Sequence, residues 1–174
     1  MSAHGRTLPQ RVRQFIQAHL GSQQVSRVTY GAIIGLALLV ALEAHPPRPV
    51  AVVASLVGTA IAVGLAELYS EVLGAETRTH RRVARAEYRH LMADVVAVGF
   101  GIAFPAVFFV LAALDVLEID TAFAAAKWSG LALIGGYGFA AARLAGNGVI
   151  RSIMQGLAVG VIGGVLIALK ALIH

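Results

Sequence analysis

Cysteine is absent from this 174-residue sequence, and charged residues are scarce. Without cysteine, neither a disulfide framework nor a thiolate metal site can form. Charged residues make up 13% of the chain and hydrophobic residues 58%, whereas about a quarter of a soluble domain is charged. This balance, with a mean hydropathy of +0.78, indicates a chain that folds in lipid.

Recognisable catalytic signatures are also missing. No Gly-x-Ser-x-Gly run or serine–histidine pairing supports a hydrolase. The glycine-rich run at 135–138 lies within an apolar stretch, so we do not expect it to bind a nucleotide. We therefore do not expect an enzyme or a resident cofactor.

Five apolar stretches are long enough to cross a bilayer, for which a helix needs about 20 residues. Prolines at 46, 47 and 49 end the first stretch, because proline cannot continue a helix. No linker divides the rest into separate domains. We expect an all-α integral membrane protein whose transmembrane domain covers residues 28–174. The expected spans are residues 28–44, 50–73, 91–114, 123–145 and 149–173.

Residues 1–27 are expected to form a cytoplasmic N-terminal segment with an amphipathic helix over residues 8–20. Basic and amide residues lie around an apolar face, which is typical of a helix at the membrane surface. A frayed tail is the alternative. The charged leader is too long for a cleaved signal peptide. The apolar face consists of Leu8, Val12, Phe15, Ile16 and Leu20.

Basic residues are distributed unevenly between the expected loops. With the N-terminus in the cytoplasm and the C-terminus outside, eleven of the 14 lysines and arginines lie on the cytoplasmic side. Because basic residues flank spans on that side, we expect this orientation. The same rule explains the net charge of +5 without a nucleic-acid partner. The exceptions are Arg48, Lys127 and Lys170.

Glu67 lies within the second expected span, where an ionisable side chain costs about 2.5–3.5 kcal/mol. Glu71 follows one turn later, so the two carboxylates share a helix face. Stacked carboxylates suit a cation or proton path, because hard cations take oxygen ligands. The alternative is that Glu67 pairs with an arginine or a backbone donor in the bundle, while Glu71 reaches towards water.

A second polar set lies at the start of the third expected span. Glu87, His90 and Asp94 share one helix face, and imidazole with carboxylate suits a transition metal. Asp94 could therefore extend the ion path of Glu67 and Glu71, or join Glu67 and His90 in a metal site. Of the two interpretations we favour the other, a salt-bridged interfacial turn, because five arginines are nearby.

Small residues recur every four positions in the fifth expected span, at Gly156, Gly160 and Gly164. Such a face lets helices approach closely. We expect it to mark packing within the bundle or between subunits.

Three stretches resemble the vacuolar iron transporter family. Residues 62–70 are similar to the family's Ser-Met-Ala-x-Gly-Glu-Tyr-x-Ser, with Glu67 and Ser70 at matching positions. Residues 101–109 are similar to Gly-x-x-x-Pro-Leu-x-Pro-Phe, and the final hairpin also follows the family pattern. The further matching residues are Gly101, Pro105, Phe109, Arg143, Gly146, Arg151 and Ser152.

The resemblance implies a homodimer that exchanges a divalent metal, iron or manganese, for protons, with Glu67 as a ligand. Two family features are missing: an Asp in the first span and a glutamate-rich metal-binding insert. Residues 74–90 are short and arginine-rich instead. Two functions remain open: a divalent-cation transporter, or a non-transporting membrane scaffold or partner subunit that has lost the metal ligands.

Overall fold

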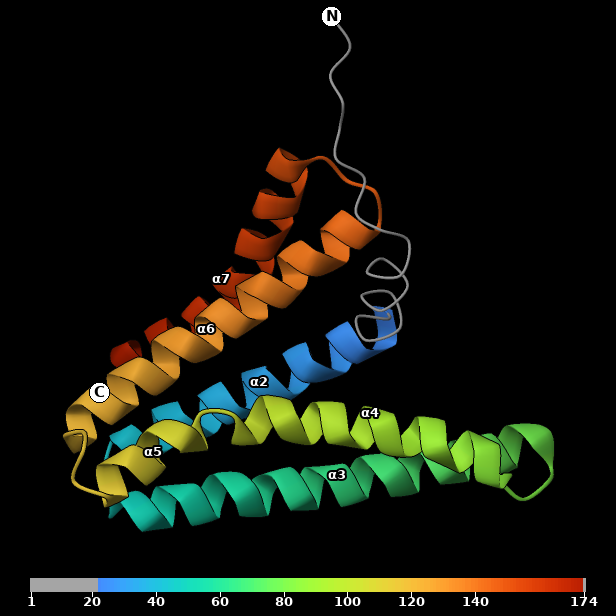
Figure 1. Cartoon of the computed structure of the whole chain (residues 1–174), viewed down its shortest axis with the longest axis horizontal. Helices are drawn as coiled ribbons and strands as arrows, with labels where there is room; N and C mark the ends of the chain where they lie inside the picture. Colours follow the sequence, from blue (N-terminus) through green and yellow to red (C-terminus); the bar gives the residue numbers. More distant parts are fainter. Residues whose placement is uncertain (1–21, 174) are drawn as a thin grey trace, which may run out of the picture.

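The computed structural model describes residues 22–173, and within that range it contains α-helices and no strand (Figure 1). The all-α prediction is therefore confirmed for these residues. The amphipathic helix predicted at 8–20 lies outside them, and the predicted boundary between residues 27 and 28 falls within the first described helix. The helices are α2 Ser22–Glu43, α3 Pro49–Thr79, α4 Arg85–Ala103, α5 Ala106–Ala113, α6 Ile119–Leu144 and α7 Val149–Ile173.

Two helices are long and apolar enough to cross a membrane on their own: Gln24–Glu43 of α2, and α3. The bent pair α4–α5 makes a third span if both helices are counted together. Lys127 and several glycines reduce the hydropathy of α6. The described residues thus support a membrane protein with two or three candidate spans, and a total of five is a prediction.

The third expected span is not one continuous helix, which corrects the prediction for residues 91–114. It divides at Pro105 into α4 and α5, which are bent by 48°. Because proline has no N–H and its ring clashes with the preceding turn, the hydrogen bond to the carbonyl of Gly101 is lost. The helix resumes at Ala106 after the amide of Phe104 donates to the carbonyl of Phe100.

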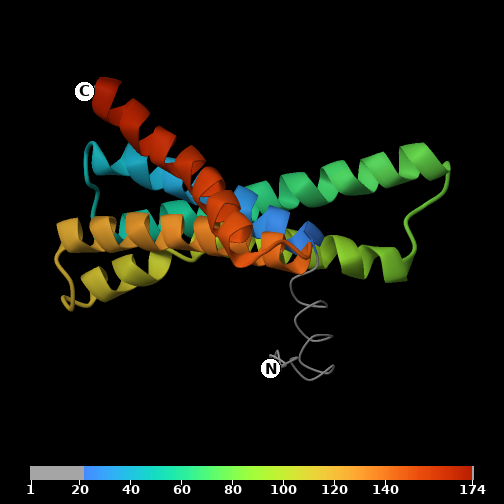
Figure 2. The ribbon, with the colours of Figure 1, turned by 90° about the horizontal axis from the view of Figure 1, so that it is seen from above.

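α2 is the central helix of the fold and packs against α3, α4, α6 and α7 (Figures 1 and 2). The largest core cluster lies near its C-terminal end, where α2, α3, α5 and α6 meet. There the rings of Phe109 and Phe123 contact edge to face, with centroids 4.8 Å apart. α6 and α7 form a hairpin in which α7 runs obliquely across α6 (Figure 2).

Glycines bring the backbones of α2 and α4 into direct contact. A Cβ atom at Gly31 would overlap the carbonyl oxygen of Val98, and one at Gly101 would overlap that of Val28. Only glycine permits this approach. The contact fixes the N-terminal half of α2 against α4, close to Arg27, which faces α3.

The glycines of α7 differ in their surroundings. A Cβ atom at Gly156 would lie 2.7 Å from the carbonyl oxygen of Gly135, so α7 approaches α6 closely there. Gly160 and Gly164 meet no described atom within 4 Å. They line an open, mainly apolar groove of about 730 Å³ between α6 and α7.

Candidate functional site

The described charged residues of α2 lie at its two ends, and each pairs with another helix. Arg27 pairs with α3, and Glu43 pairs with Lys127 of α6. The two positions are sixteen residues apart, which is about 24 Å along a helix. No charged residue lies between them, and their separation is close to the roughly 30 Å thickness of a hydrocarbon core.

Arg27 holds two carboxylates of α3 with one side chain. One terminal nitrogen, Nη1, pairs with Glu67, and Nη2 donates to Oε1 of Glu71 at 2.5 Å. The acids are one turn apart on α3, so a forked guanidinium can reach both. The side chains are partly buried, with exposed fractions of 26% for Arg27, 19% for Glu67 and 33% for Glu71.

The charges of this cluster do not balance. One guanidinium faces two carboxylates, which leaves a charge of −1 when both acids are ionised. Among residues 22–173, no other basic side chain forms an ion pair with Glu67 or Glu71. Within these residues, the cluster therefore keeps an unneutralised carboxylate charge near the start of α2 and twelve to eight residues before the end of α3. Such a charge attracts a cation.

The cluster adjoins a cavity of about 430 Å³ lined by Ser26, Arg27, Tyr30 and Glu67. A water molecule occupies about 30 Å³ in the liquid, so the cavity has room for a partly hydrated ion. Its walls supply a phenol and a hydroxyl group besides the carboxylate. Oxygen groups of this kind suit hard cations.

Arg27 belongs to the candidate site, and the sequence alone does not connect it to Glu67. The charge distribution places Arg27 among the cytoplasmic basic residues, and no local pattern identifies it as the arginine partner of Glu67. A signal was present in the hairpin geometry. Arg27 lies sixteen residues before α2 ends and Glu67 eighteen after α3 begins, so the antiparallel helices place them at nearly the same height.

The structure does not join α4 to this cluster. His90 is exposed and Asp94 is half-buried. Across residues 22–173, no three His, Cys, Asp or Glu side chains gather closely enough to hold a metal ion. Glu67, His90 and Asp94 thus form no common centre there. In the same range, neither His90 nor Asp94 forms an ion pair.

The pair at the other end of α2 joins two helices. Nζ of Lys127 donates to Oε1 of Glu43 at 2.6 Å. Each side chain is partly buried, so the pair ties α6 to α2 beside the main core cluster. This pair joins one base to one acid.

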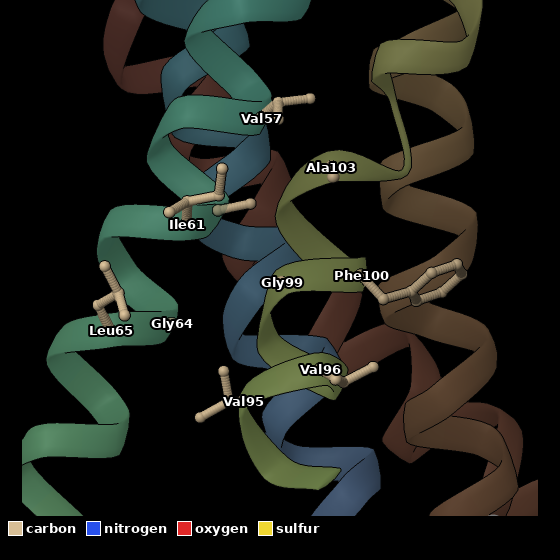
Figure 3. Close-up of a pocket in the computed structure, with 10 residues that line it drawn as sticks. Val57, Ile61, Gly64, Leu65, Val95, Val96, Gly99, Phe100 and Ala103 are labelled. Atoms are coloured by element: carbon tan, nitrogen blue, oxygen red, sulfur yellow. The ribbon is translucent and has the colours of Figure 1, made fainter. Parts of the chain in front are cut away.

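A further hollow between α3 and α4 is purely apolar. It measures about 460 Å³, and Val57, Ile61, Leu65, Val96 and Phe100 are among its lining residues (Figure 3). No polar side chain lines it. It therefore offers no ligand to an ion and no group for chemistry, and its surface suits an acyl chain.

Comparison of the chain with family models, with curated proteins and with solved structures found no match. The resemblance to the vacuolar iron transporters accordingly stays a prediction based on the residues named above.

Proposed function

We propose that this chain is a multi-pass membrane transporter for a divalent cation, with Glu67 as the residue that takes up the ion. The observation that carries the proposal is the unbalanced cluster, in which one guanidinium serves two carboxylates. A pair that only fastened α2 to α3 would need a single acid. The second carboxylate supplies the negative charge that an incoming cation requires.

Arg27 acts in this proposal as an internal counter-ion. It neutralises part of the carboxylate charge while no substrate is bound, which lowers the cost of keeping Glu67 on an apolar helix. A cation arriving through the adjoining cavity competes with the guanidinium for the same oxygens. The carboxylates thus bind either the cation or Arg27, and release of the cation restores the ion pair with Arg27.

The proposed arrangement has five spans, a cytoplasmic N-terminus and an external C-terminus. The start of α2 and the α3–α4 and α6–α7 turns point towards one end of the molecule, and the α2–α3 and α5–α6 turns towards the other (Figure 1). The first end carries most of the arginines, and the second carries Asp115, Glu118 and Asp120. This asymmetry supports the orientation.

A membrane scaffold or partner subunit is the second candidate. The ion pair between Arg27 and Glu67 favours it, because a neutralised carboxylate can serve stability alone. The lack of a three-ligand group in residues 22–173 favours it as well. Transport and scaffolding predict different results in one experiment.

The experiment is uptake of Mn²⁺ or Fe²⁺ into liposomes that contain the purified full-length chain. Wild type should exceed protein-free liposomes, and Glu67→Gln should abolish the excess. Glu76→Gln is the matched control, since Glu76 is also half-buried on α3 but lies outside the cluster, and it should transport normally. A folded wild-type chain that moves neither ion would overturn the proposal in favour of the scaffold.

A further inference from the structure

The end of α3, the start of α4 and the turn between them form a concentrated basic surface, which we call the arginine turn. Arg81 and Arg82 lie in the turn itself, Arg78 lies in the last turn of α3, and Arg85 and Arg89 lie in the first two turns of α4; all five are exposed. Within the part of the chain that the structure describes, none of the five takes part in an ion pair. The positive charge of this arginine turn is therefore available to a partner.

A groove on α3 leads into the arginine turn. It measures about 630 Å³ and is lined by Tyr69, Ser70, Leu73, Gly74, Thr77 and Arg78. Tyr69 is 71% exposed and Leu73 is 52% exposed, so the apolar wall is open. The guanidinium of Arg78 lies beside Gly74, as a Cβ atom added at Gly74 would be 3.4 Å from Nη1 of Arg78. The groove thus has an apolar body and a cationic end.

The position of this groove in the bilayer follows from its distance along α3. Tyr69 lies twenty residues after α3 begins at Pro49, or about 30 Å at 1.5 Å per residue. That distance equals the thickness of a hydrocarbon core. In the proposed membrane orientation, the apolar wall therefore lies at the inner edge of the core. The arginine turn begins nine residues further on, on the cytoplasmic side, and its long side chains extend back to the lipid headgroups.

We propose that the groove and the arginine turn bind an anionic phospholipid of the cytoplasmic leaflet. The headgroup phosphate contacts the guanidinium groups of Arg78, Arg81 and Arg82, whose forked donors match phosphate oxygens. An acyl chain covers Leu73 and Tyr69. This inference depends on the proposed membrane orientation and does not depend on cation transport.

Charge and position together favour a lipid over a soluble anionic partner. A basic cluster directly beside a membrane span attracts anionic lipid. A free phosphate or a purely acidic peptide has no apolar part that would cover Tyr69 and Leu73, whereas an acyl chain does. The groove also opens to the side of α3, where a lipid in the same leaflet can enter.

The test is native mass spectrometry of the full-length protein in detergent with dioleoyl-phosphatidylglycerol or dioleoyl-phosphatidylcholine. Wild type should retain the anionic lipid preferentially. Arg81→Gln/Arg82→Gln should bind it about thirtyfold more weakly. Arg48→Gln/Arg151→Gln, which removes the same charge from exposed positions elsewhere, should leave binding unchanged. Leu73→Ala should weaken binding of the long-chain lipid.

Three results would overturn the proposal. Wild type could retain both lipids equally, which would mean that headgroup charge does not matter. Both double variants could lose binding equally, which would assign the effect to net charge and not to this turn. Inorganic phosphate at the lipid's own concentration could displace the lipid, which would make a free anion the ligand.

Discussion

Arg27 stabilises the packing of α2 against α3 through ion pairs with Glu67 and Glu71. The partial burial of all three side chains determines how much these pairs contribute to the free energy of unfolding. Fully exposed ion pairs contribute about 0–1 kcal/mol. Breaking a fully buried pair costs about 3–5 kcal/mol, because a charge is left without compensation. The cluster lies between these limits, so its effect on stability is measurable.

Arg27→Gln should lower the stability of the folded chain by about 1–3 kcal/mol, because two carboxylates one turn apart then repel each other. Arg27→Lys should cost less, since it keeps the charge but not the fork that reaches both acids. Thermal unfolding of the purified protein in one detergent measures both. Equal stability of wild type and Arg27→Gln would show that the cluster contributes nothing to folding.

At the scale of the helix, the contact between α2 and α4 depends on glycine. Gly101→Ala should destabilise the protein by about 1–3 kcal/mol, the usual cost of overpacking, because the new methyl group meets backbone atoms of α2 that cannot move aside. Gly99→Ala is the control on the same helix, where a Cβ atom meets nothing within 4 Å. It should be neutral or stabilising. Similar unfolding temperatures for the two variants would contradict this packing.

α6 ends at a glycine whose backbone adopts the left-handed conformation. Gly146 has a φ of 85°, its amide donates to the carbonyl of Arg143, and the amide of Asn147 donates to that of Ala142. This is a Schellman ending, which favours glycine. Gly146→Ala should cost about 1–2 kcal/mol, and Gly148→Ala, where φ is not left-handed, should cost less. Thermal unfolding compares them, and a larger loss at Gly148 would be inconsistent with the strain argument.

Hydropathy and proline positions predicted the helical stretches because both act locally. α3 continues six residues beyond the apolar stretch predicted to span the membrane, since residues 74–79 are too polar for the hydrocarbon core but still form helix. The break at Pro105 was not predicted, because a proline within a membrane helix can kink it or be tolerated. The outcome depends on how α4 packs against α2, which is a tertiary effect.

The site was predictable in part for the same reason. Glu67 can be recognised from the sequence because the free-energy cost of a carboxyl group in an apolar span is evident from the residues next to it. Its pairing with Arg27 depends on the register between two helices, which the sequence encodes through the length of the hairpin. The grouping of Glu67 with His90 and Asp94 had no such constraint, and the structure does not bring the three together.

At the scale of the whole molecule, the charge difference between the two ends predicts how the chain lies in the bilayer. Because the chain has no cysteine of its own, any maleimide label found on the purified chain comes from the introduced cysteine. In intact cells, an impermeant maleimide should label Glu118→Cys and should label Arg82→Cys only after the membrane is opened. Labelling of Arg82→Cys in intact cells would refute a cytoplasmic α3–α4 turn.

The proposed transport requires a cation to compete with Arg27 for Glu67 and Glu71. Binding of Mn²⁺ to the purified full-length chain in detergent measures this competition. Removing the competing guanidinium in Arg27→Gln should tighten binding by about tenfold or more, since a change of 1.4 kcal/mol suffices. Glu67→Gln should abolish binding, and Glu76→Gln should leave it unchanged. If Arg27→Gln bound Mn²⁺ no more tightly than wild type, or if no variant bound it, the exchange between Arg27 and a cation would be contradicted.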